Sequence, residues 1–215
     1  MKKFLLVFAF FISSLSGVYS LETKFQLGFS PSLMLNTDTS LNSAVSPIVT
    51  PINFAINLKI KENFCIEPRL SFFYYYSLWA NNRALPAEIE NRTGTTFSFM
   101  LDCPFDFTKT FNKNHIFQIG AGPSFLIRFA TLSNNVNADD YGVTGSAQGD
   151  LSCINSWFWQ NANFLFVKAH ALYLYKFNSS VQAGPEFSFS LPIGSFIENN
   201  PLHNALISAG IQFRF

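Results

Sequence analysis

The stretch SAGIQFRF, residues 208–215, ends the chain and alternates strictly between two kinds of side chain. One set is apolar and consists of Ala209, Ile211, Phe213 and Phe215; the other is polar or small and consists of Ser208, Gly210, Gln212 and Arg214. A period of two is typical of a β-strand with one apolar and one polar face. Because domain termini are usually frayed and polar, two aromatic rings here predict a strand whose apolar face meets an apolar environment.

The same alternation recurs along the chain and predicts eight strands. They cover residues 23–35, 48–60, 64–78, 94–107, 115–129, 164–176, 181–191 and 203–215. The strand over 164–176 is apolar on both faces near its start, and we expect its register to turn Val167 outward and Lys168 inward. The charged residues of the strands all share the polar face: Lys24, Lys59, Glu67, Arg69, Asp102, Asp106, Arg128, Lys168, Glu186 and Arg214. A lipid-facing Arg or Lys near the bilayer midplane costs about 2–4 kcal/mol, so this segregation indicates a wall exposed to lipid.

The first residues predict an export signal. Lys2 and Lys3 precede an apolar run from Phe4 to Ile12, and small residues follow that run. This order predicts a signal peptide over residues 1–20, cleaved to leave one barrel domain over residues 21–215. The apolar run is too short to span a bilayer as a helix.

The composition favours a membrane β-barrel over other exported proteins. Charged residues make up only 13% of the chain and aromatic residues 17%, whereas soluble domains carry about 25% charged residues. No later stretch of about 20 apolar residues offers a membrane helix, so a membrane β-barrel is one of the few remaining options. The 14 Lys and Arg nearly balance the 13 Asp and Glu, so we expect no nucleic-acid partner.

The connections between the predicted strands alternate in length. Those after the second, fourth and sixth strands are short, and the others are mostly longer, including polar loops expected over 80–92 and 130–160. Short turns on one rim and long loops on the other are the outer-membrane arrangement, with both chain ends at the periplasmic rim. The predicted fold is therefore an all-β, transmembrane, antiparallel up-and-down barrel of eight strands.

A soluble, lipocalin-like barrel would show the same alternation with its apolar face turned inward. The polar face here is mostly Gly, Ser, Asn and Gln, whereas a solvated exterior is rich in Lys and Glu. The aromatic residues also gather into two expected girdles, as at the two interfaces of a bilayer. One girdle comprises Phe25, Phe64, Phe105, Phe107, Tyr173, Tyr175, Phe213 and Phe215, and the other Tyr74, Tyr76, Trp79, Trp157 and Trp159. Both observations favour the membrane barrel.

Two stretches resemble a known superfamily. IGAGPSFLIRF at 119–129 and SAGIQFRF at 208–215 are similar to corresponding strands of the small eight-stranded OmpW/OmpA/OmpX-like outer-membrane β-barrel proteins. The resemblance implies that Phe213 and Phe215 form an assembly signal read by the outer-membrane assembly machinery. It also implies passage of small hydrophobic compounds for OmpW-like members, and structural or adhesive roles for OmpX-like and OmpA-like members. The chain ends with the barrel, so we do not expect the periplasmic cell-wall-binding domain of OmpA-type proteins.

Charged side chains of both signs are predicted to converge in the barrel interior. They are Glu67, Arg69, Asp102, Arg128, Lys168, Glu186 and Arg214. Because eight strands leave little free bore and buried charges must be compensated, we expect a paired structural plug; a gated polar pore is the alternative. A sideways hydrophobic conduit would need an apolar upper lumen, for which the candidates are Phe73, Phe164, Phe166, Leu172 and Leu174.

Prolines and cysteines give further expectations about the wall. Proline cannot donate to a β-ladder, so the six prolines in or near the strands are expected at bulges or strand ends. They are Pro31, Pro51, Pro68, Pro104, Pro123 and Pro185. Cys65 is expected to point inward and Cys103 outward, which makes a disulfide between them geometrically poor.

The predicted function is structural or surface-interacting, adhesin-like, through the extracellular loops of an integral protein of the bacterial outer membrane. The alternatives are a narrow channel for small, hydrophobic solutes and an outer-rim enzyme, for which only Asp139, Asp140 and His203 are candidates. We expect no enzyme, cofactor or metal site. The expected partners are outer-membrane lipid, the assembly machinery and a host or environmental ligand at the loops; the oligomeric state stays open.

Overall fold

The computed structural model describes residues 23–36, 47–87, 92–197 and 203–215. The predicted signal peptide lies outside these residues. In the described part, eight wall strands follow one another, and four of them are split into two collinear segments. In chain order they are β1 (Thr23–Phe29) with β2 (Ser32–Asn36), β3 (Ile48–Val49) with β4 (Ile52–Lys61), β5 (Phe64–Ile66) with β6 (Arg69–Ala80), β8 (Gly94–Asp102) with β9 (Phe105–Phe111), β10 (His115–Leu132), β11 (Leu165–Lys176), β12 (Gln182–Pro192) and β13 (His203–Arg214).

Each wall strand pairs antiparallel with the next, and the last returns to the first. β13 pairs with β1 through Leu27↔Phe213 and Phe29↔Ile211, and with β2 further along. The terminal residue continues this pairing, because Phe215 N donates to Phe25 O at 2.8 Å and Phe25 N donates to Phe215 O at 3.2 Å. The ring is therefore closed, and the predicted eight-stranded antiparallel barrel is confirmed.

Side chains alternate across the wall as the sequence predicts. Large apolar residues cover the exterior; Phe25 and Phe105 are each 63% exposed. The charged residues on the polar face are buried inside, except Lys24, Lys59, Lys61 and Lys176 near the short turns. β11 has the expected register, since Val167 is exposed and Lys168 is buried. A barrel whose outer surface is apolar all the way around presents the kind of surface that faces the lipid of a bilayer.

Four of the six prolines in or near the wall strands lie where a strand is interrupted. Pro31, Pro51, Pro68 and Pro104 separate the two segments of the four split strands. The carbonyl of each proline still accepts a bond from the neighbouring strand, donated by the backbone N–H of Ala209, Ser30, Ile56 and Glu67 respectively. Pro123 lies opposite the Cys103–Pro104 break, and Cys103 N donates to its carbonyl. The expectation of bulges or strand ends is confirmed for Pro31, Pro51, Pro68 and Pro104. It is wrong for Pro123 and Pro185, which lie inside the continuous strands β10 and β12.

The interval over 80–92 was expected to be a loop, and that expectation is wrong. It contains β7 (Arg83–Ala87), which pairs with the end of β6 from Tyr76↔Ala87 to Ala80↔Arg83. The reason is apolar burial: Leu85 and Ala87 pack against Leu78. The hairpin extends the wall at this point.

The interval over 130–160 was also expected to be a loop, but it contains α2 (Ala147–Phe158). Ser146 caps the helix, since its side chain accepts a hydrogen bond from Gly149 N. The apolar face of α2 comprises Leu151, Ile154, Trp157 and Phe158, which pack against Ala84 and Ala130 of the wall. Trp157 is therefore buried beneath the helix and does not belong to the exposed girdle to which we assigned it.

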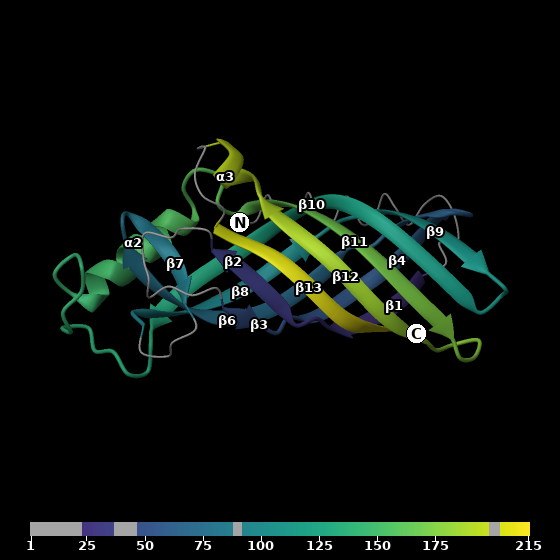
Figure 1. Cartoon of the computed structure of the whole chain (residues 1–215), viewed down its shortest axis with the longest axis horizontal. Coiled ribbons are helices and arrows are strands. Elements are labelled where there is room, and N and C mark those ends of the chain that lie inside the picture. The colour runs from purple at the N-terminus through teal and green to yellow at the C-terminus, as the bar shows by residue number, and fades with distance from the viewer. Residues whose placement is uncertain (1–22, 37–46, 88–91, 198–202) are drawn as a thin grey trace, which may run out of the picture.

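Figure 1 shows α2, β7 and the short α3 (Ile193–Ile197) at one end of the barrel, here called the helix end. The short turns that join β4 to β5, β9 to β10 and β11 to β12 lie at the other end, here called the turn end, together with the C-terminus. The predicted alternation of connection lengths is thus confirmed. None of the described helices has the length and apolar character needed to cross a membrane.

Candidate functional site in the barrel interior

A network of paired charges fills the interior nearer the turn end. Arg69 of β6 bonds two carboxylates: Nη2 lies 2.6 Å from Glu67 Oε1, and Nη1 lies 2.5 Å from Glu186 Oε1 of β12. Arg214 of β13 adds a second cation on Glu67, with Nη2 2.9 Å from Oε2. These residues are at most 3% exposed, and each buried charge is compensated by a partner of opposite sign.

Neutral amides link this network around the bore. Gln118 Nε2 donates to Glu67 Oε2 at 3.0 Å and to Asp106 Oδ2 at 2.8 Å, while its Oε1 accepts from Arg214 Nη2 at 2.7 Å. Gln26 Oε1 accepts from Arg214 Nε at 3.0 Å. Five wall strands or strand junctions are therefore tied together by bonds across the interior.

A second ion pair lies beside the network. Lys168 Nζ of β11 is 2.6 Å from Asp102 Oδ2 of β8, and the strand between them carries the small residues Gly122 and Ser124 at the same level. Six of the seven residues that we assigned to an interior charge network are thus in ion pairs: Glu67, Arg69, Asp102, Lys168, Glu186 and Arg214.

Arg128 is the exception, and its assignment to the network is corrected. It points inward as expected and is 1% exposed, but it lies beneath α2. Its Nη2 donates to Asn163 O at 2.9 Å, and its guanidinium carbon is 4.1 Å from the centre of the Phe158 ring. No ion pair joins it to a carboxylate of the described residues. The alternation of side chains correctly predicted that Arg128 points inward. Arg128 lies nearer the helix end than the network does, and therefore does not join it.

Apolar side chains fill the interior nearer the helix end. One cluster of eight buried residues comprises Met34, Val49, Phe73, Tyr75, Met100, Leu126, Phe166 and Leu206. Only Phe73 and Phe166 of these were candidates for an apolar upper lumen. The others are apolar residues on the otherwise polar face, a signal that the sequence carries.

The remaining candidates for an apolar upper lumen lie elsewhere. Leu172 and Leu174 form a separate cluster with Ile116. Phe164 packs against Phe125 and Trp159, with ring centres 5.2 Å and 5.9 Å away. A cavity of about 20 Å³ borders both interior layers, which is room for about one water molecule.

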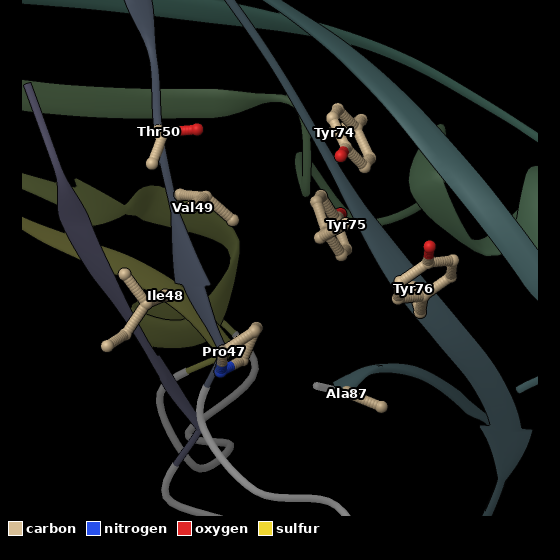
Figure 2. Close-up of a pocket in the computed structure, with 8 residues that line it drawn as sticks. All are labelled: Pro47, Ile48, Val49, Thr50, Tyr74, Tyr75, Tyr76 and Ala87. Carbon is tan, nitrogen blue, oxygen red and sulfur yellow. The ribbon is translucent and has the colours of Figure 1, made fainter. Parts of the chain in front are cut away.

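The wall has an opening between β3 and β6, here called the window. Pairing of β4 with β6 stops at Ile52↔Phe72, and pairing of β6 with β7 starts only at Tyr76↔Ala87. A cavity of about 330 Å³ occupies the interval (Figure 2). Its outward-facing lining residues are Ile48, Thr50, Tyr74 and Tyr76, and its inward-facing ones are Pro47, Val49, Tyr75 and Ala87. The window therefore spans the thickness of the wall.

Among the side chains that the structure describes, Asp139 and Asp140 join no catalytic group at the helix end. Asp139 and Asp140 are exposed, and Asp140 Oδ2 accepts from Asn137 N at 2.6 Å within its own turn. His203 begins β13. Within residues 23–36, 47–87, 92–197 and 203–215, no group of three potential metal ligands is found. The three cysteines are free thiols, with Cys65 buried inside and Cys103 half-buried, as expected of opposite faces.

No family model matches this sequence, and no curated protein sequence does. Among solved structures, the chain is similar to Neisserial surface protein A, with a TM-score of 0.53 and 7% identity over 90% of this chain and 97% of that one. OprG of Pseudomonas aeruginosa has a TM-score of 0.48 and 8% identity, over 90% of this chain and 95% of that one. At this identity the first similarity shows the fold alone, that of a small outer-membrane β-barrel; the second is too weak to add to it.

Proposed function

We propose that this chain is an integral protein of the bacterial outer membrane with a structural and surface-interacting role. The exposed apolar wall supports the membrane location, because an apolar band whose wall-strand charges are buried inside or lie near the short turns is typical of a surface that faces lipid. The protein folded in detergent should migrate faster on a gel before heating than after it, and should partition into the detergent phase. Failure in both assays would favour a soluble barrel.

The closed interior carries the structural role. Ion pairs fill one layer and apolar side chains the next, and the cavity between them holds about one water molecule. Such a barrel has no aqueous path along its axis. We expect no conductance in planar bilayers and no swelling of liposomes by small sugars; reproducible single-channel steps would contradict the closed barrel.

The helix end supports the surface-interacting role, because it holds an exposed segment on a rigid base. Tyr141 is 94% and Val143 70% exposed. Asp150 of α2 holds the segment, since its carboxylate accepts from Val143 N at 3.1 Å and from Thr144 N at 2.9 Å. Loops on rigid scaffolds are where binding sites usually occur.

Cells that display the protein should adhere to a host or environmental surface through this segment. Replacing residues 138–143 by Gly and Ser should abolish adhesion while leaving surface expression unchanged. Unchanged adhesion would show that residues 138–143 do not mediate it. We assign no catalytic function to Asp139, Asp140 or His203; an enzymatic activity that is lost on their substitution by Ala would instead favour a rim enzyme.

Passage of small hydrophobic solutes is the second candidate function. The apolar upper interior and the window favour it, while the charge network below them opposes transfer to the turn end. Uptake of a radiolabelled hydrophobic solute into proteoliposomes, compared with protein-free liposomes, tests this candidate. Equal uptake in the two would exclude it.

A further inference from the structure

Arg128 is a buried cation with unused hydrogen-bonding capacity. A guanidinium has five N–H donors, and the structure gives one bond, from Nη2 to Asn163 O. Nε and Nη1 have no hydrogen-bond partner among the described residues. The surroundings are apolar, since the rings of Phe158 and Trp157 lie 4.1 Å and 5.9 Å from the guanidinium. A buried charge without a counter-charge is strongly destabilising, so this position is suited to an anion from outside the chain.

Tyr75 connects this cation to the window. Its ring is 3% exposed and lines the window from within (Figure 2). Tyr75 of β6 and Arg128 of β10 are both buried and flank β8 at neighbouring levels, because Tyr75 pairs with Thr96 and Arg128 with Ser98. No contact between the hydroxyl and the guanidinium meets hydrogen-bond geometry. The hydroxyl also has no other hydrogen-bond partner among the described residues. Two unsatisfied polar groups therefore lie together at the inner side of an opening in an otherwise apolar region.

The window itself suits an apolar chain. Ile48 is 70% exposed on the outer side, and Val49 belongs to the buried apolar cluster on the inner side. A ligand that passes between them contacts these two apolar side chains, while the hydroxyl-bearing side chains of Thr50, Tyr74 and Tyr76 also line the opening. The cavity of about 330 Å³ is within the range of small-molecule sites, which begins at about 300 Å³.

We propose that the window binds an amphipathic carboxylate, with its apolar chain between β3 and β6 and its carboxylate on Arg128 and Tyr75. The guanidinium matches a carboxylate with two parallel N–H donors, and the tyrosine hydroxyl supplies a third. This site goes beyond the proposed structural and surface role. It rests only on the membrane location, from which an amphiphile reaches the window sideways.

Binding of radiolabelled dodecanoate to the protein in phosphatidylcholine nanodiscs tests the site, with empty nanodiscs as the background. The wild-type protein should bind saturably, with one dodecanoate per chain. Arg128→Gln should raise the Kd at least tenfold, because the neutral amide loses the ionic bond. Tyr75→Phe should raise the Kd severalfold, and Val49→Trp should abolish binding by filling the window.

Matched controls separate the site from general charge and from misfolding. Lys61→Gln removes an exposed cation at the turn end and should leave the Kd unchanged. Dodecanol lacks the charge, so its binding should not differ between wild type and Arg128→Gln. Heat-modified migration on a gel shows whether each variant is folded, and Tyr75→Phe and Val49→Trp keep the test decisive if Arg128→Gln does not fold.

Two results would overturn the proposal. One is dodecanoate binding to the wild type that does not exceed that of empty nanodiscs. The other is an equal Kd for the wild type and folded Arg128→Gln. Either result leaves the membrane location untouched, because detergent partitioning measures it separately.

Discussion

Arg69 and Glu186 meet across the full width of the barrel. β6 and β12 are four strands apart in either direction around the ring, yet Nη1 and Oε1 are 2.5 Å apart. One contact therefore joins opposite walls and occupies the centre of the bore. This pair stabilises the round cross-section directly, which no bond between neighbouring strands can do.

Removing one partner of this pair should destabilise the barrel. Glu186→Leu leaves Arg69 with one of its two carboxylates, and we expect the free energy of unfolding to fall by about 3 kcal/mol. The double variant Arg69→Met with Glu186→Leu should recover part of that loss, because it buries apolar groups in place of an unbalanced charge. Urea unfolding in micelles, followed by tryptophan fluorescence, measures both. Lys61→Met at the exposed turn end is the control, and an equal loss in that variant would deny the pair any special role.

Gly122 should tolerate no side chain. A Cβ there would lie 2.4 Å from Cys103 O and 2.6 Å from Pro104 Cα, both backbone atoms that cannot move aside easily. We expect Gly122→Ala to lower the free energy of unfolding by about 1–3 kcal/mol. Gly94→Ala is the matched control, because its nearest atom would be 3.3 Å away. The same urea experiment compares the two variants. Equal stabilities would show that the backbone at Cys103 and Pro104 shifts easily to accommodate a Cβ atom.

Asp150 should control the order of the exposed segment before α2. Besides two backbone donors, its carboxylate accepts from Thr144 Oγ1 at 2.8 Å. Asp150→Ala should therefore speed chymotrypsin cleavage after Tyr141 severalfold while the barrel stays folded. Mass spectrometry of the fragments measures the rate. Asp139→Ala is the control, and similar rates in the two variants would contradict the anchoring role.

Deletion of Phe215 should impair assembly more than folding. The residue contributes two backbone bonds to Phe25 and an aromatic ring that is 54% exposed, while its role as an assembly signal stays a prediction. We expect insertion into the outer membrane of cells to fall more than refolding in detergent. Phe105→Ala removes another exposed ring of the same girdle and should affect the two assays alike. Equal losses on deleting Phe215 would leave only the packing role.

The alternation of side chains was enough to predict the ring of strands. It assigned Phe213 outward and Arg214 inward because a strand has only two faces. Closure followed from the membrane location, because a sheet with a free edge cannot span a bilayer. β7 and α2 were missed because their short apolar patterns lie within polar intervals; the cap at Ser146 and the spacing of Leu151, Ile154 and Phe158 were readable signals.

The sequence predicted which side chains point into the barrel interior, but not which of them pair with one another. Arg69 and Glu186 are 117 residues apart, and only the closed ring determines that they meet. Arg128 shares their face but lies at another height, under a helix that was not predicted. The window was not predictable either, because it arises where β3 and β6 diverge and not from the residues of one strand.

The prolines have a consequence before the barrel forms. Long, uninterrupted apolar strands are templates for intermolecular β-aggregation in an unfolded chain. Pro31, Pro51, Pro68 and Pro104 divide four such strands into shorter segments, and each removes one N–H donor from a potential fibril ladder. The folded wall tolerates them because their carbonyls still find partners. The residues that interrupt the finished sheet should therefore make the unfolded polypeptide less prone to aggregate. We expect Pro51→Thr with Pro68→Thr to accelerate thioflavin-positive aggregation after dilution from urea without detergent.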